Sequence, residues 1–357
     1  MKRDTDLANA LTKMDQAISN GNTQAAYEAR KALLHEHPTL HDDPQLAAKT
    51  LEVSQAERSV VRFEPESRAA LTETPVSSVV ATLVVAERRG AAAAGVNGVV
   101  PFRIDGAIYA LSAADGALLW RRFVGHDPGV APISLPGGRI IVPDAEAKEL
   151  VCLRADSGEL IWRQPLVDAL STPVFAGNVL YVAGASGKLF ILDAGSGSLK
   201  GRVEFGQPIH VPPAVSVDSE RIYVVGEHSN LYALSSKDYA CLGVYYLGHA
   251  KGSVTVAPVS VLDKVIVAEN YGAETCRVHA VDVNAEGDAV AEAAANRLDG
   301  LIVTPMLIAG RRVATLTTKG AINVYEVAPG DGAAALNQLA ARDAARGQQL
   351  ARYGLIK

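Results

Sequence analysis

The sequence predicts a mainly β protein: a β-propeller of six to eight four-stranded blades, in a closed or an incomplete ring, with a short N-terminal α-helical arm. Three observations predict it. Helical periodicity is confined to the first 60 residues, a unit of about 40–47 residues then repeats, and each unit holds short apolar strands separated by turns. We therefore divide the chain into a helical arm (1–60) and propeller repeats (61–357).

The arm is predicted to contain three helices. The second is expected to start at the cap Asn22-Thr23 and to stop at His37-Pro38, and the third to follow Pro44. Such a unit resembles a tetratricopeptide-type hairpin, which cannot bury both of its faces alone. It therefore either braces the main body or docks a partner, and both interpretations stay open. The first helix is predicted by apolar residues spaced three and four apart: Leu7, Leu11, Met14 and Ile18.

One group of residues in the arm has the residue types of a metal site. It lies at a helix end and in a loop punctuated by proline, where no fixed face presents the ligands together. We predict that it binds no metal. The group consists of His35, His37, His41, Asp42 and Asp43.

The repeat is marked by a proline that opens each unit, followed by strands of similar pattern. A lone four-stranded sheet of this kind leaves two apolar faces exposed, and stacking the sheets radially buries them. The first opening proline is Pro75, and the five later ones lie 40–47 residues apart from one another: Pro132, Pro173, Pro213, Pro258 and Pro305. The most regular strand recurs at 107–111, 149–153, 188–192, 230–234, 277–281 and 321–325.

Two further positions of the repeat are predicted to be structural anchors. A turn rich in Asp, Ser and Gly follows the regular strand and ends at Gly116, Gly158 and Gly197, where glycine adopts positive φ without steric cost. The only two tryptophans, Trp120 and Trp162, occupy one equivalent position in successive units. We predict that they pack between blades rather than forming a platform for a ligand.

These turns resemble the tryptophan-docking motif of the PQQ-binding-like (quinoprotein-repeat) β-propeller family. The motif appears as ALSAADGALLW over 110–120, CLRADSGELIW over 152–162 and ILDAGSGSL over 191–199. Asp193 keeps the family's acidic position, whereas Ser112 and Arg154 depart from it. The resemblance covers about residues 75–346.

The family includes two kinds of protein. Its dehydrogenases hold pyrroloquinoline quinone and Ca²⁺ on the ring axis and typically carry a vicinal cysteine pair, whereas its BamB-like members are non-catalytic scaffolds of outer-membrane protein assembly. This sequence has no vicinal cysteines and no CxxCH motif. The resemblance is therefore closest to the BamB-like members, and it implies no cofactor; PQQ with calcium belongs to the alternative.

Composition narrows the function classes further. A net charge of −5 without a basic stripe argues against nucleic acid as a partner. Three widely spaced cysteines predict neither a disulfide framework nor a zinc site, but buried small side chains. We expect no transmembrane segment and see no signal peptide in this chain, so its compartment is open, with the periplasm or cell envelope implied by the family resemblance.

No nucleophile, phosphate-loop or zinc-protease motif appears in a fitting context, so we predict no catalytic residue and no metal site. The best candidates for a shared binding surface are polar residues of neighbouring blades: His210, Glu227, His228 and His249. We expect a protein partner, held by blade loops or by the helical arm. Oligomeric state and partner identity are not predicted.

The end of the ring is harder to predict. Residues 333–342 are expected to form the fourth strand of the sixth unit, although their alanine content also suits a helix. If the ring closes with six or seven blades, residues 59–63 or 79–85 are candidates to complete the last sheet; the alternative is that the chain is a piece of an eight-bladed parent.

The leading hypothesis is a non-enzymatic propeller scaffold that mediates protein–protein interaction, in bacterial envelope or outer-membrane protein assembly. The alternatives are a PQQ-dependent or degenerate quinoprotein and a propeller that senses a ligand. Fold alone does not choose among them.

Overall fold

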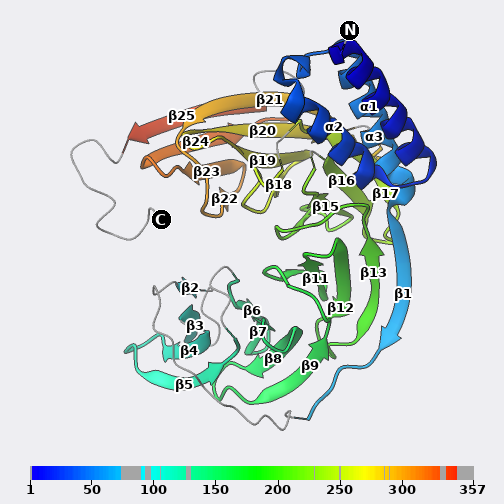
Figure 1. Cartoon of the computed structure of the whole chain (residues 1–357). Coiled ribbons are helices and arrows are strands. Elements are labelled where there is room, and N and C mark those ends of the chain that lie inside the picture. Colours follow the sequence, from blue (N-terminus) through cyan, green and yellow to red (C-terminus); the bar gives the residue numbers. More distant parts are fainter. Residues whose placement is uncertain are drawn as a thin grey trace. The chain divides into compact units, whose positions relative to one another are not determined.

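The computed structural model of the chain describes residues 2–73, 90–92, 98–104, 106–125, 130–228, 230–248, 251–284, 286–288, 290–329 and 335–343. It is mainly β, with a helical N-terminal region (Figure 1). The chain forms two compact units: unit 1 contains Met1–Phe63 and Val203–Lys357, and unit 2 contains Glu64–Arg202. The sequence-based boundary between residues 60 and 61 stays a prediction.

The arm consists of three helices and one short 3₁₀ turn, as the periodicity predicts. The side chain of Asn22 accepts a hydrogen bond from the backbone N–H of Ala25, and Asp43 caps the third helix, which starts at Pro44. The apolar stripes of the helices meet in one cluster around Met14 and Leu46. The elements are α1 (Lys2–Ser19), α2 (Thr23–Glu36), η1 (Pro38–Leu40) and α3 (Pro44–Val60).

Unit 2 contains three antiparallel sheets. The first consists of β2 (Gly90–Ala92), β3 (Val99–Ile104), β4 (Ala107–Ser112) and β5 (Leu118–Phe123). The second consists of β6 (Ile133–Leu135), β7 (Arg139–Asp144), β8 (Glu149–Arg154) and β9 (Leu160–Pro165). The third consists of β10 (Val174–Ala176), β11 (Val179–Gly184), β12 (Lys188–Asp193), β13 (Leu199–Glu204) and, paired with β13, β1 (Arg62–Arg68).

Unit 1 contains three further four-stranded sheets. The fourth consists of β14 (Ala214–Val215), β15 (Arg221–Val225), β16 (Asn230–Ser235) and β17 (Cys241–Tyr246). The fifth consists of β18 (Val259–Val261), β19 (Lys264–Tyr271), β20 (Thr275–Val283) and β21 (Val290–Asp299). The sixth consists of β22 (Leu307–Ala309), β23 (Arg312–Leu316), β24 (Ala321–Val327) and β25 (Leu336–Asp343).

The repeat predicted from the sequence is also present in the register of the paired strands. In five of the sheets, the third and fourth strands pair with a register shift at the same position of the unit. Such a bulge adds one residue to a strand and increases its local twist. The shifts lie at Ala110/Leu111, Cys152/Leu153, Ala233/Leu234, Ala280/Val281 and Val324/Tyr325.

Two expectations for the sheet edges have different outcomes. The segment predicted at 333–342 forms β25 (Leu336–Asp343), so it is a strand and not a helix. The idea that 59–63 completes the last sheet is wrong: α3 runs to Val60, and the strand that follows it, β1, pairs with β13 of the third sheet. The alternative at 79–85 and the opening proline Pro75 lie outside the described residues.

The core lies between successive sheets, as stacked blades require. In unit 2, one cluster joins the first and second sheets and another joins the second and third. In unit 1, two clusters join the fourth sheet to the fifth and the fifth to the sixth. Cys152 and Cys276 are buried free thiols, as expected, whereas Cys241 is half-buried. Burial raises the pKa of Cys152 to about 12.

The tryptophans lie across these inter-sheet contacts. Nε1 of Trp120 donates to the carbonyl of Ala155 over 2.7 Å, and a Cβ added to Gly158 would lie 2.7 Å from Cδ2 of Trp120. A Cβ on Gly197 would lie closer still to the ring of Trp162. Each ring therefore covers a glycine turn of the next sheet. Asp193 has a local role in its own turn, where it accepts hydrogen bonds from the backbone N–H groups of Gly195 and Ser196.

Candidate functional site

Three of the four polar residues predicted to share a surface come together at one rim of unit 1. His210 precedes β14, and Glu227 and His228 lie in the turn between β15 and β16. Nε2 of His210 lies 3.1 Å from Oε1 of Glu227. Lys251, which the sequence analysis did not single out, places Nζ 3.2 Å from the other carboxylate oxygen of Glu227. The fourth residue, His249, lies outside the described residues.

Glu227 is the charged centre of this rim cluster, which we define as His210, Glu227, His228 and Lys251. Burial by itself raises the pKa of Glu227, but the hydrogen bonds and charges of Lys251 and His210 outweigh it and hold the pKa below its usual value. Glu227 is therefore ionised at neutral pH.

His228 lies beneath the rim and faces the arm. Only 6% of it is exposed, and its ring stacks on that of Tyr27 from α2, with 5.4 Å between centroids. Its Nε2 lies 3.8 Å from Glu28 and 3.9 Å from Glu227, and has no hydrogen-bond partner among the described residues. Burial, the largest influence, lowers the pKa of His228, so the imidazole is neutral at neutral pH.

A cavity of about 320 Å³ opens beside the rim cluster. That volume is at the small end of the range for ligand pockets, and it accommodates one or two side chains rather than a large cofactor. Most of its wall is apolar, so an apolar group is the occupant that its interior favours. The cavity is lined by His210, Val211, Val225, Gly226, Glu227, Gly252, Val254 and Thr255.

The arm is attached to the fourth sheet, next to this rim, by buried hydrogen bonds. Both carboxylate oxygens of Glu57 on α3 accept bonds: Oε1 from Nε2 of Gln207 over 3.1 Å, and Oε2 from the hydroxyl of Tyr232 over 2.9 Å. Glu57 and Tyr232 are fully buried. In Figure 1, α2 and α3 run beside β16 and β17.

A second set of bonds at the same interface centres on Asn230, which is also fully buried. Its Nδ2 donates to the hydroxyl of Tyr27 over 2.8 Å, and its Oδ1 accepts from the hydroxyl of Ser54 over 2.6 Å. The two sets together define the arm network. Because each side chain is paired, the network holds α2 and α3 in one position on β16.

Burial is also the largest influence on Glu57, and it raises the pKa of this carboxyl group although the hydrogen bonds from Tyr232 and Gln207 oppose the shift. Burial is also the main reason why the pKa of Tyr232 is raised above its usual value. The sequence analysis missed this network. The available signal was Glu57 itself, because it continues the buried stripe of α3 formed by Leu46, Thr50 and Val53.

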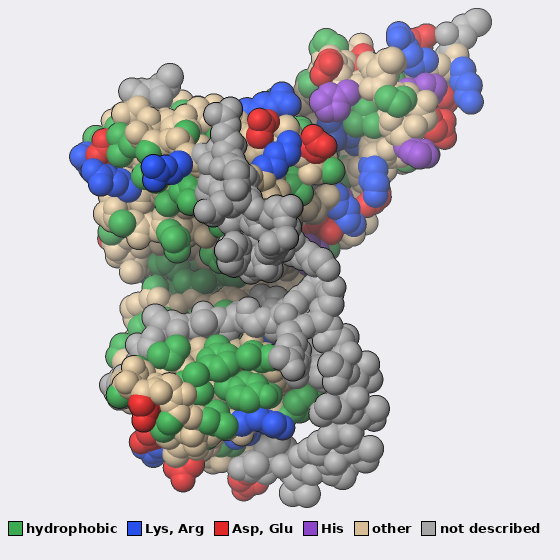
Figure 2. All heavy atoms as spheres, turned by 90° about the vertical axis from the view of Figure 1, so that its left-hand side faces the viewer, with side chains coloured by type: hydrophobic (Ala, Val, Ile, Leu, Met, Phe, Trp, Pro, Cys, Tyr) green, Lys and Arg blue, Asp and Glu red, His purple; other side chains and the backbone are tan. Residues whose placement is uncertain are grey.

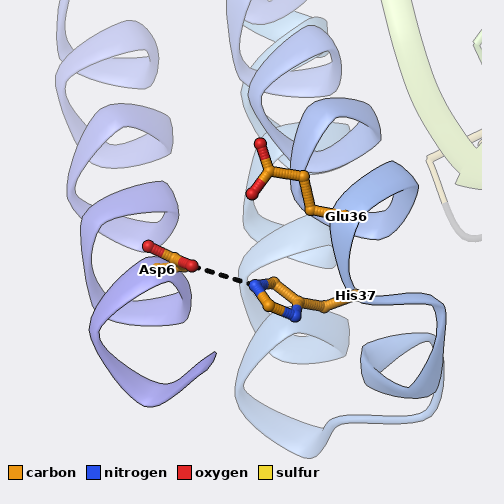
Figure 3. A group of neighbouring side chains, drawn as sticks. All are labelled: Asp6, Glu36 and His37. Carbon is orange, nitrogen blue, oxygen red and sulfur yellow. Dashed lines mark hydrogen bonds and ion pairs between the residues drawn. The ribbon is translucent and has the colours of Figure 1, made fainter. Parts of the chain in front are cut away.

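In the structure, His37 of the arm lies beside residues that are outside the group considered in the sequence. His37 lies with Asp6 and Glu36, and the three ligand atoms are within 4.8 Å of one another (Figure 3). Nε2 of His37 already makes a 2.9 Å hydrogen bond to Asp6, which ties the end of α2 to α1. His41 pairs with the neighbouring Asp42 at the surface. The expectation that no metal binds stays a prediction.

The repeat and the sheets agree with a comparison against protein families. A family model described as outer membrane protein assembly factor BamB, of the PQQ-repeat type, matches residues 104–335. The chain belongs to this family. The resemblance to PQQ-binding-like propellers of BamB-like character is thereby confirmed.

Relatives and one solved structure support the same assignment. Outer membrane protein assembly factor BamB from Moranella endobia (strain PCIT) is 24% identical over 236 residues, which cover 61% of this chain and 57% of the relative. Its counterpart from Alkalilimnicola ehrlichii (strain ATCC BAA-1101 / DSM 17681 / MLHE-1) is 27% identical over 148 residues, covering 38% of this chain and 37% of the relative. The chain thus aligns with about half, or less, of these curated relatives.

The crystal structure of BamB from Moraxella catarrhalis superposes with a TM-score of 0.53 at 18% identity, covering 66% of this chain and 68% of that one. This likeness shows the propeller fold. Within the described residues, no helix is both long enough and apolar enough to cross a membrane.

Proposed function

We propose that this chain is a non-catalytic propeller scaffold in outer-membrane protein assembly, and that it binds a protein segment at the rim cluster of unit 1. The observation that carries the proposal is the pairing of an apolar cavity with an ionised carboxylate at its mouth. The names of its relatives supply the biological setting.

The chemistry of the rim describes the segment that suits it. Val211, Val225 and Val254 favour an apolar side chain in the cavity, while Glu227 is left able to accept a hydrogen bond from a backbone N–H or a basic side chain at the edge. His210 and Lys251 offset part of the charge of Glu227. The cluster therefore favours a mixed apolar and polar peptide over a strongly basic one.

Site-specific photocrosslinking tests the proposal. A photoreactive phenylalanine analogue is placed at His210, and a control analogue at Val217, which is 75% exposed beyond the opposite end of β15. Envelope extracts of the organism that encodes the chain are irradiated and adducts are identified by mass spectrometry. We expect an adduct with an outer-membrane assembly protein from position 210 and none from position 217.

A charge reversal provides the matched control. Glu227→Lys should abolish that adduct, whereas Glu220→Lys, the same change at an exposed position at the start of β15, should leave it unchanged. Adducts from both positions at equal yield, or an adduct insensitive to Glu227→Lys, would refute binding at this rim.

We propose in addition that the scaffold works without a bound cofactor and in the cell envelope. Pyrroloquinoline quinone with Ca²⁺ should therefore leave the melting temperature unchanged, because a molecule stabilises a fold only when it binds the native state. A saturable rise in melting temperature with a new visible absorbance band would support the quinoprotein alternative instead. Fractionation of cells that express the native gene tests the compartment.

A further inference from the structure

A second charged surface lies on the same rim of unit 1 as the cavity, at the turn between β19 and β20. Thr255 in the cavity wall accepts a 3.0 Å hydrogen bond from Nδ2 of Asn270, and the next residue, Tyr271, is 47% exposed. The turn after Tyr271 is equivalent to the turn that contains Glu227, because each joins the second and third strands of its sheet. The cavity wall is therefore continuous with this second turn.

Two arginines lie beside this turn without an acidic partner. Arg277 on β20 and Arg297 on β21 are directly opposite each other in the register of the two strands, and both are exposed. Like charges placed directly opposite each other destabilise a strand pair. Neither guanidinium has an ion-pair partner among the residues that the structure describes, and Asp299, two positions beyond Arg297, pairs with neither. The described part of unit 1 thus leaves this positive charge without a bound anion.

Other acidic side chains around the turn already have partners. Glu269, which lies opposite the first arginine on β19, is 2.9 Å from Nε2 of His279, and Glu292 is 2.7 Å from Nδ1 of the same ring. In the turn itself, Glu274 pairs with Lys319 over 3.5 Å. Figure 2 shows basic and acidic side chains interspersed in the part of the molecule that contains the helical arm. The arginine pair departs from this pattern of paired charges, so a ligand is the natural source of its anion.

Tyr271 orders one of the two arginines. The guanidinium carbon of Arg277 lies 5.5 Å from the centroid of the Tyr271 ring, which is within the range of a cation–π interaction. A guanidinium that is already ordered loses less side-chain entropy on binding, and its planar fork matches the two oxygens of a carboxylate. Tyrosine and arginine are also the residue types enriched in the energetic centres of protein interfaces. This surface therefore suits a carboxylate side chain of a protein.

We propose that Arg277 and Arg297 bind the carboxylate of an aspartate or glutamate in the same protein segment whose apolar side chain enters the cavity. The inference rests on the function proposed above and adds a charge pattern to the segment. The residues around Thr255 are bonded to β19, so β20 lies two strand spacings, about 10 Å, from them. About three or four extended residues span this distance. The segment therefore carries its acidic residue three or four positions from its apolar anchor.

Peptides of defined sequence test the charge pattern. The probes are fluorescein-labelled peptides of threonine residues with one leucine as the apolar anchor. Two of them carry a glutamate four positions before or after the leucine, which covers both directions of binding, and each has a counterpart with glutamine in place of glutamate. Fluorescence anisotropy is measured during titration with the full chain. We expect one glutamate peptide to bind saturably and at least about tenfold more tightly than its counterpart, because only the carboxylate makes charge-assisted hydrogen bonds to both arginines.

Paired substitutions place the preference for glutamate at the two arginines. Arg277→Gln combined with Arg297→Gln should remove the preference. Arg311→Gln combined with Arg312→Gln, at the turn between β22 and β23, should retain it. All four residues are exposed, so both variants should match the near-ultraviolet circular dichroism of the parent chain. Equal binding of the glutamate and glutamine peptides by the parent chain, a preference that survives in the first variant, or no saturable binding overturns the inference.

The crosslinking experiment at position 210 separates this inference from the proposed function. An adduct that depends on Glu227, combined with equal binding of the glutamate and glutamine peptides, overturns the arginine site and leaves binding at the rim in place. Absence of the adduct overturns the proposed function and this inference with it. An adduct that depends on Glu227, whose yield also falls when both Arg277 and Arg297 are replaced, supports both.

Discussion

Gly197→Ala tests whether tryptophan docking stabilises unit 2. Two costs add at this position. The first is backbone strain, because φ is 72° and an alanine in the left-handed region costs about 1–2 kcal/mol. The second is a clash, because the new Cβ would overlap the ring of Trp162, which is only 2% exposed. Overpacking of this kind costs about 1–3 kcal/mol.

The sum predicts that Gly197→Ala lowers the free energy of unfolding by about 2–5 kcal/mol. Gly177→Ala isolates the first cost, since its φ is also positive and a Cβ there meets no atom within 4 Å. Denaturant unfolding, followed by tryptophan fluorescence, measures both variants. If Gly197→Ala is no more destabilising than Gly177→Ala, the ring of Trp162 does not depend on the glycine, and the docking argument fails.

Three further predictions concern the arm. Asn230→Ala leaves the hydroxyls of Tyr27 and Ser54 without their partner, so we expect it to lower the free energy of unfolding by about 2–4 kcal/mol and to expose the arm to limited proteolysis; unchanged proteolysis would contradict this. Glu57→Gln removes a carboxyl group whose pKa is raised by burial, so as pH rises above the usual glutamate value of about 4.5 the free energy of unfolding of the variant should fall less than that of the parent, as measured by urea titration at each pH. His228→Phe retains a ring against Tyr27 and removes a group whose pKa is lowered by burial, so its stability should fall less than that of the parent as pH drops below about 6.5; parallel curves in urea titrations would reject the assignment of a buried neutral imidazole.

The parts of the fold that could be predicted from the sequence are those with a clear local pattern of residues, and most of these patterns recur in several units. The six regular strands, the turns at Gly116, Gly158 and Gly197, and the helices of the arm each follow from local patterns of apolar and turn residues. A local pattern does not indicate which strand an additional strand pairs with. The pairing of β1 with β13 therefore could not be predicted, because it joins segments more than 130 residues apart in the chain.

The candidate site shows the same division. His210, Glu227 and His228 could be selected as polar loop residues of a repeat, because the connection into a sheet and the turn between its second and third strands lie at the same rim. Lys251 and Asn230 could not, because a lysine before a strand or an asparagine at the start of one has no local signal of its partner. Asn230 is bonded to Tyr27, 203 positions earlier in the chain. Only the packing of α2 and α3 on β16 brings such groups together.

The two titratable groups buried beneath the arm act in opposite directions with pH. The raised pKa of Glu57 means that the folded state favours its protonated form, so its stabilising contribution is complete at low pH and is lost as pH rises through the raised value. The lowered pKa of His228 means that the folded state favours the neutral ring, so its contribution is present above the usual histidine value and is lost as pH falls. Between the usual glutamate and histidine pKa values, the two contributions therefore change stability in opposite directions as pH changes. Each single variant removes one of these two contributions. A plot of the free energy of unfolding against pH should therefore differ in slope from that of the parent chain, with opposite sign for Glu57→Gln and His228→Phe.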